Sequence, residues 1–262
     1  MAKTLKTFFC SQSMVAMILV LLAVLTLLPS NGSANEQTLV MQIQDTQPKY
    51  FLGNSDQLGL CGDIYAELKS RLDKKGITVS IPTEYTPFKR ILHNLEKGKA
   101  DAYCGAARNP DREKIFIYSE LPLYATHHVL MARIDDFYSP TSYEELIKSE
   151  SRIGGLLGTY SVRHLLINGV TRINDTFLNP DEAIDALLKK QINFIYYHDL
   201  ALDYFLLQHK KTLRILKTRF YSYKHWMIYS KSTPIELRLI IEAEILDMIK
   251  SGLVEKFRNK IR

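Results

Sequence analysis

Short runs of β-type residues alternate with amphipathic helical segments along most of this 262-residue chain. The β-type runs lie at 38–43, 77–81, 100–104, 128–133, 152–157 and 192–197. Between them, apolar residues recur at helical spacing, as in the stripe formed by Ile64, Leu68 and Leu72. A strand, a crossover helix and a second strand make a parallel pair with the helix on the sheet face. The alternation therefore predicts an α/β fold, and the length suits two halves of about 100 residues each.

Capping residues followed by proline or acids mark the expected helix starts. We expect helices to begin near Asp63 and at Thr86-Pro87, Asn109-Pro110, Thr159 and Asn179-Pro180, with capping boxes at 141–144 and 233–236. Gly76, Gly98, Gly169 and Gly252 supply the stops.

Residues 1–34 have the pattern of a secretory signal peptide. Lys3 and Lys6 precede an apolar run over 14–28, which Pro29 breaks, and small residues lead up to Ala34. We expect cleavage after Ala34 and a protein delivered to the periplasm. The alternative is a membrane anchor, which usually needs about 20 apolar residues. The formal net charge of +6 gives no reason to expect a nucleic-acid partner.

Two cysteines, Cys61 and Cys104, remain after the expected signal peptide. Export implies an oxidising compartment, and an even count suits one disulfide. Two separate buried thiols are the alternative, since cysteine packs well as a small apolar residue.

The sequence lacks the common signatures of cofactor, metal and nucleophile sites. It has no phosphate-binding loop, no dinucleotide fingerprint, no His-Glu-x-x-His pair and no Gly-x-Ser-x-Gly elbow. We therefore expect no cofactor, no metal and no catalytic residue.

The most informative stretch is 98–112, in which an expected strand, the turn at Gly105 and the helix start at Pro110 follow one another. A helix N-terminus presents free backbone N–H groups, and Arg112 adds a planar two-pronged donor. Together they predict a carboxylate site. The alternative is that Arg112 pairs only with a neighbouring acid such as Asp111 or Glu113.

The order of elements resembles the type II periplasmic solute-binding proteins of polar amino-acid ABC transporters (family 3). The motifs that carry the resemblance are Gly59 with Asp63, Leu95 with Gly98 and Asp101, Asn109 with Arg112, Tyr118-Ser119 with Tyr124, Gly158 to Ser161, and Gly252 with the basic end at Lys260. The resemblance implies a two-lobe α/β fold with a central ligand cleft and a two-strand hinge. Lobe 1 would comprise 35–124 and 227–262, and lobe 2 would comprise 129–222.

The resemblance also implies ligand-binding residues. Arg112 matches the arginine that holds the ligand carboxylate, and Thr159 matches the lobe-2 residue that completes that site. Gly105 matches the carbonyl that contacts the ligand amine, and Asp199 or His198 matches the acid that pairs with it. The remaining candidates are Asn109, Ser161, Tyr50 and Phe51. We further expect Cys61 and Cys104 to form a bridge beside the cleft.

The chain departs from the family pattern near the arginine, where Ala107 and Asn109 replace the usual hydroxyl residues. The implied function is binding of a small polar carboxylate or amino-acid-like solute, for ABC-type uptake or sensing, by a monomer that works with a permease or a sensor protein. The alternative is a periplasmic enzyme on the same scaffold, similar to cyclohexadienyl dehydratases, with Glu84 or Asp199 as its acid.

Overall fold

The computed structural model describes residues 37–51 and 57–261. The expected signal peptide and its cleavage after Ala34 lie outside the described residues. Within the described part, no helix combines the length and the apolar character that a bilayer crossing needs.

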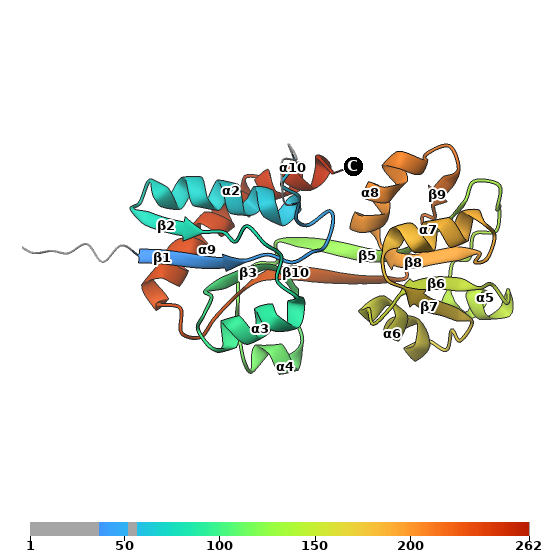
Figure 1. Ribbon diagram of the computed structural model, residues 1–262, viewed down its shortest axis with the longest axis horizontal. Coiled ribbons are helices and arrows are strands. Elements are labelled where there is room, and N and C mark those ends of the chain that lie inside the picture. Colours follow the sequence, from blue (N-terminus) through green and yellow to red (C-terminus); the bar gives the residue numbers. More distant parts are fainter. Residues whose placement is uncertain (1–36, 52–56, 262) are drawn as a thin grey trace, which may run out of the picture. The chain divides into compact units, whose positions relative to one another are not determined.

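Strands and helices alternate along the described chain (Figure 1). The strands are β1 (Gln37–Gln42), β2 (Ile77–Ser80), β3 (Ala102–Ala107), β4 (Ile117–Tyr118), β5 (Tyr124–Arg133), β6 (Ile153–Leu156), β7 (Ile173–Phe177), β8 (Phe194–His198), β9 (Leu213–Ile215) and β10 (Tyr221–Tyr229). The helices are α2 (Leu60–Asp73), α3 (Phe88–Glu96), α4 (Pro110–Glu113), α5 (Tyr143–Lys148), α6 (Tyr160–Ile167), α7 (Pro180–Leu188), α8 (Asp199–His209), α9 (Ile235–Lys250) and α10 (Leu253–Asn259). The expected α/β class is confirmed.

The main strands follow the order β2-β1-β3-β10-β5-β8-β6-β7. At one end β1 pairs in parallel with β2 and β3, and at the other end β6 pairs in parallel with β7 and β8. Between these groups, β10 and β5 pair in antiparallel fashion with each other and with their outer neighbours. One continuous sheet thus has a parallel group of strands at each end, and an antiparallel pair joins the two groups.

Strands β5 and β10 run from one group to the other (Figure 1). Residues 221–225 of β10 pair with 124–128 of β5, whereas 225–229 pair with β3. On β5, residues 128–132 pair with β8. About half of each strand therefore pairs with the other crossing strand, and the other half pairs with β3 or β8. The expected two-strand connection is present.

We use lobe 1 for residues 37–124 and 227–261, and lobe 2 for 129–222. One core cluster takes all its buried members from lobe 1 except Leu200 of α8. Two further clusters consist of lobe-2 residues. They lie on opposite faces of β5, because Val129 and Met131 belong to one while Leu130 and Ala132 belong to the other.

Local sequence sets two helix starts as expected. Asn109 precedes α4 and accepts a hydrogen bond from Arg112 N, and Asn179 precedes α7 and accepts one from Glu182 N. The box expected at 141–144 is displaced by one residue, because Ser142 caps α5 by accepting from Glu145 N.

Two expected threonine caps are wrong. Helices α3 and α9 follow Pro87 and Pro234, and neither has a side-chain cap. The hydroxyl of Thr233 instead donates to the carbonyl and carboxylate of Asp101, at 3.2 Å each. Thr233 therefore bonds to Asp101, which is distant in sequence, and not to the first amides of α9.

Helix α2 begins at Leu60, three residues earlier than expected, because its first amides have backbone acceptors. Leu60 N donates to Pro48 O at 3.1 Å, and Cys61 N donates to Lys49 O at 2.8 Å. Gly59 makes this approach possible: its φ is +82°, and a Cβ there would lie 2.7 Å from the Lys49 carbonyl. The contact fixes Lys49 against the start of α2.

We expect Gly59→Ala to destabilise the protein more than Gly76→Ala. Both glycines have positive φ, but a Cβ on Gly76 would meet nothing within 4 Å. The strain shared by both changes costs about 1 kcal/mol. The backbone clash at position 59 should add about 1–3 kcal/mol. Urea denaturation measures the difference; equal losses would show that the 48–49 segment yields freely.

Candidate functional site

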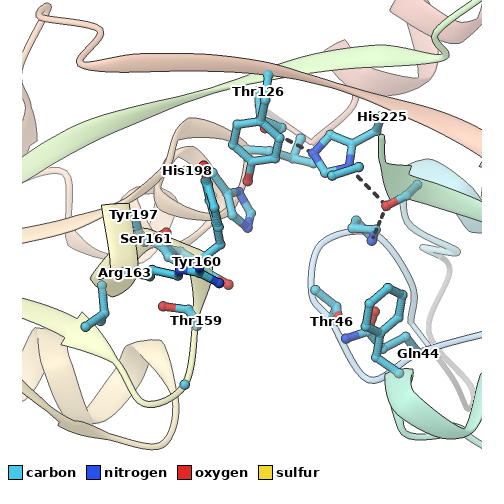
Figure 2. Close-up of a pocket in the computed structure, with 18 of the residues that line it drawn as sticks. Gln44, Thr46, Thr126, Thr159, Tyr160, Ser161, Arg163, Tyr197, His198 and His225 are labelled. Carbon is cyan, nitrogen blue, oxygen red and sulfur yellow. Dashed lines mark hydrogen bonds between the residues drawn. The ribbon is translucent and has the colours of Figure 1, made fainter. Parts of the chain in front are cut away.

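Residues of both lobes and of the crossing strands line a cavity of about 670 Å³. Figure 2 shows Thr159, Tyr160 and Ser161 on one side of it, with Gln44 and Thr46 on the other. The lobe-1 lining also includes Lys49, Phe88, Tyr103, Gly105, Ala107, Arg112 and Tyr124. From the crossing strands and lobe 2 come Thr126, Gly158, Val162, Arg163, Leu166, Asp175, Tyr197, His198, Leu200, Tyr223 and His225.

Lys49 is a buried cation of the lobe-1 wall, with 7% of its surface exposed. Its Nζ donates to Tyr103 Oη and to Gly105 O, at 3.2 Å each. The Tyr103 hydroxyl in turn donates to Gln44 Oε1 at 2.7 Å. Burial, and then the charge of Arg112, lower the pKa of Lys49 to about 7.

Arg112 lies half-buried in the same wall. Its Nη1 donates to Ala107 O at 2.9 Å, and its guanidinium lies 4.9 Å from the centre of the Phe88 ring. The two neighbouring acids pair elsewhere: Asp111 pairs with Lys114, and Glu113 with Arg108. No carboxylate of the described residues forms an ion pair with Arg112, so the local pairing considered from sequence does not occur.

The carbonyl of Gly105 is the junction between β3, β10 and the 48–50 segment. Besides Lys49 Nζ it accepts from His225 Nδ1 at 3.0 Å. Burial and the charge of Lys49 lower the pKa of His225 to about 3, so the ring is neutral at neutral pH. Since Nδ1 carries the proton, Nε2 accepts from the Thr126 hydroxyl at 3.1 Å (Figure 2).

On the lobe-2 wall, the cavity meets the start of α6. Thr159 does not cap this helix, because its hydroxyl donates to Leu156 O at 2.8 Å. The Ser161 hydroxyl lies 3.1 Å from His128 Nε2, and His128 Nδ1 lies 3.2 Å from Tyr196 Oη. Burial, with a smaller contribution from His164, lowers the pKa of His128 to about 3. Neutral His128 thus forms a hydrogen bond with the Ser161 hydroxyl and holds it in position.

His198 and Asp199 take different positions. His198 lines the cavity, and its Nδ1 accepts from Ala201 N at 3.2 Å. Burial lowers the pKa of His198 well below its usual value, so the neutral ring carries its proton on Nε2. Asp199 is buried and does not line the cavity.

The carboxylate of Asp199 is held by other groups. Oδ1 accepts from the amides of His127 and Leu200, at 3.0 and 2.9 Å, and Oδ2 pairs with Arg258 at 3.3 Å. Asp199 thus joins the start of α8 to α10.

Three further candidates also lie outside the cavity lining. The Tyr50 hydroxyl donates to Cys104 O at 2.8 Å, beneath the wall. Phe51 packs on Tyr204 of α8, with 5.5 Å between ring centres. Asn109 is occupied as the α4 cap. Of the residues expected from sequence, the structure therefore brings together Gly105, Arg112, Thr159, Ser161 and His198.

Sequence reasoning missed Lys49, His225, Thr126, Tyr103 and Gln44. One available signal was that ligands of α/β proteins bind beyond the carboxyl ends of the strands. Gln44 and Lys49 follow the end of β1. The strand pattern gave no comparable signal for His225.

Cys61 and Cys104 form a disulfide between the first turn of α2 and β3, with 5.8 Å between their Cα atoms. Tyr65 Oη accepts from Cys104 N at 2.8 Å, and Cys61 Sγ lies 3.9 Å from the hydroxyl of the cavity residue Tyr124. The expected bridge is present, and it holds the strand immediately before Gly105.

No protein-family model matches the chain, and no curated protein sequence matches it. Solved structures do. A mutant ArgBP from T. maritima has a TM-score of 0.66 at 19% identity, with 87% of this chain and 96% of that chain covered. The substrate binding protein of an amino acid ABC transporter gives 0.64 at 18%, with 85% and 98% covered.

The ancestral amino acid-binding protein AncCDT-1, described as a precursor of cyclohexadienyl dehydratase, gives a TM-score of 0.67 at 21% identity, with 85% and 94% covered. This chain has the two-lobe fold of the type II periplasmic binding proteins. The fold class expected from the resemblance is confirmed, and the cavity lies where residues of the two lobes meet.

We expect removal of the bridge to cost about 4 kcal/mol of unfolding free energy, the chain-entropy value for a loop that 43 residues separate. Urea denaturation of Cys61→Ala/Cys104→Ala measures the loss, and reduced wild-type protein should reproduce it. Two free thiols in the denatured, non-reduced protein, cleaved at Ala34, would contradict the bridge.

We expect stability to fall as the pH drops from 6.5 toward 3. His128 and His225 stay neutral in the folded protein down to pH about 3, whereas unfolded histidine protonates near 6.5. Unfolding at pH 5 should therefore take up about one proton for each of these two rings. The pH dependence of urea denaturation measures this uptake. His225→Asn should remove about one proton of it.

Proposed function

We propose that this protein is an extracytoplasmic solute-binding protein. It takes a small polar carboxylate or amino-acid-like solute into the cavity between its lobes, for ABC-type uptake or for sensing. The observation that carries the proposal is the set of three basic side chains in the lining, Lys49, Arg112 and Arg163, none of which pairs with a carboxylate of the described residues.

The charges favour an anion because they are unbalanced within the cavity. Among the described lining residues, Asp175 is the one that carries a carboxylate. Arg112 presents a fork of N–H donors, which matches a carboxylate in two-pronged geometry. Its neighbouring acids are already paired. A solute carboxylate therefore has a partner for which no carboxylate of the described residues competes.

The architecture suits capture by closure. The two lobes are joined through the ladder of 124–128 with 221–225, and the cavity lies beside it. Small rotations in two such strands can close two lobes on a ligand, a hinge motion. The structural neighbours named above are described as amino-acid-binding proteins, and this supports a solute of similar size.

The expected partners and location belong to the same proposal. A binding protein of this kind works in the periplasm, as a monomer, and passes its solute to an ABC permease or its signal to a sensor protein. Cell fractionation and N-terminal sequencing of the exported protein test the location; the sequence should start at Asn35.

The competing proposal is an enzyme similar to cyclohexadienyl dehydratase, which the description of AncCDT-1 brings forward. Such chemistry needs an acid at the substrate. The acids expected for it, Glu84 and Asp199, do not line the cavity. This favours the non-catalytic proposal, and turnover of prephenate or arogenate would support the enzyme instead.

We expect Arg112→Gln to raise the Kd for the bound carboxylate by about 10- to 100-fold, because a charge-assisted hydrogen bond is lost. Arg108→Gln is the matched control, since Arg108 lies just before α4 and outside the cavity. Calorimetry measures both variants with a ligand found by thermal shift, where a concentration of 100 times Kd stabilises by about 2.7 kcal/mol. Equal effects of the two changes would refute Arg112 as the anchor.

A further inference from the structure

The acceptors that an α-ammonium group would need are already occupied. The Gly105 carbonyl accepts from both Lys49 Nζ and His225 Nδ1, which fills its two lone pairs. Asp199, the acid expected to pair with the amine, is bound by Arg258 and by two backbone amides. An ammonium placed near Arg112 would also face that guanidinium, a cation with no acceptor to offer.

The donors around the same place are in excess. Lys49 and Arg112 are close enough for the charge of Arg112 to lower the pKa of Lys49. Arg163 adds a third positive charge from the first turn of α6, a helix of eight residues whose cap residue, Thr159, makes no capping bond. A helix N-terminus favours negative charge, and here a cation accompanies it.

We propose that the solute is a small dicarboxylate that carries no ammonium group beside the carboxylate held by Arg112 and Lys49. This rests on the proposed binding function and specifies its substrate class. The first carboxylate lies on Lys49 and Arg112 in lobe 1. The second lies toward Arg163 and the start of α6 in lobe 2, so that the ligand links the lobes. Its apolar body packs on the rings of the lining, Phe88, Tyr103, Tyr124, Tyr160, Tyr197 and Tyr223.

Binding of a dianion should also take up a proton. Without ligand, the pKa of Lys49 is about 7, through burial and the charge of Arg112. A carboxylate beside Nζ stabilises the charged form and raises this pKa. Above pH 7 the free protein must therefore gain a proton when it binds, and the affinity falls as the pH rises.

Several other groups face Lys49. They are Arg112 of α4, Tyr103 of β3 and His225 of β10, with Tyr50 beside it and His198 within electrostatic reach. Burial raises the pKa of the two tyrosines, and the pKa values of the two histidines are depressed. Between pH 7 and 9, Lys49 is therefore the member of this group that titrates.

The first experiment compares ligands that differ in one group. Glutarate and 2-oxoglutarate lack the ammonium of glutamate, and benzene-1,3-dicarboxylate tests a ring as the body. Calorimetry at pH 8 should give a dicarboxylate a Kd at least about 10-fold below that of glutamate, arginine or glutamine. Binding of the amino acids with equal or greater affinity would overturn the inference and leave the solute-binding function standing. If neither the dicarboxylates nor the amino acids bind, the result would count against the solute-binding function itself.

The second experiment uses two lysine variants with the best dicarboxylate. Lys49→Met keeps a long unbranched side chain and removes its charge, and Lys256→Met, at an exposed position of α10, is the control. We expect the first to raise Kd by about 10- to 100-fold and the second to leave it unchanged. Titrations at pH 8 in buffers of different ionisation enthalpy should show uptake of about one proton in the wild type and close to none in Lys49→Met.

Asp175 supplies the opposing test, because it is the lining carboxylate to which an ammonium could bind. Asp175→Asn should leave dicarboxylate affinity unchanged or increase it, since a negative charge is removed. Loss of binding in this variant together with retention in Lys49→Met would overturn the inference. If Lys49→Met does not fold, proton uptake by the wild type decides alone: none at pH 8 would overturn it.

Discussion

The carbonyl oxygen of Gly105 holds the binding region together. It accepts from a lysine that follows β1 and from a histidine of the crossing strand β10, so one atom links three segments of the chain. Gly105 has a φ of +90°, and a Cβ there would lie 2.5 Å from the Tyr124 hydroxyl and 2.8 Å from Lys49 Cε. Glycine is therefore needed for both the turn and the approach of the lysine. The same two bonds use up the acceptor that would otherwise face a solute.

Around this atom, buried polar groups satisfy one another before any solute arrives. Tyr50 and Tyr65 bond to the carbonyl and amide of Cys104, and Tyr65 also donates to Gln42 O. Buried networks of this kind are rigid when every member is paired. The disulfide at Cys104 adds a covalent constraint at the same place. The lobe-1 wall is thus a preorganised surface, and the charge that it leaves without a carboxylate partner is that of Arg112.

Local sequence predicted the elements whose causes are local. Asn109 and Asn179 cap their helices because a short side chain meets an amide three residues on. Thr233 failed as a cap because Asp101, 132 residues away in sequence, offered a better partner. The site follows the same division. Arg112 was predictable from its turn, whereas the capture of Asp199 by Arg258 and the burial of Lys49 depend on contacts that only the folded chain makes.

The order of the lobes along the chain has a consequence for how the protein is made. The lobe-1 core takes Met227, Ile241 and Phe257 from the last part of the sequence, whereas the lobe-2 clusters need only residues 129–216. The half that emerges first from the ribosome therefore cannot finish its core until the C-terminal helices have been synthesised. Folding of lobe 1 therefore depends on contacts between the two ends of the chain, whereas lobe 2 is built from one continuous middle segment.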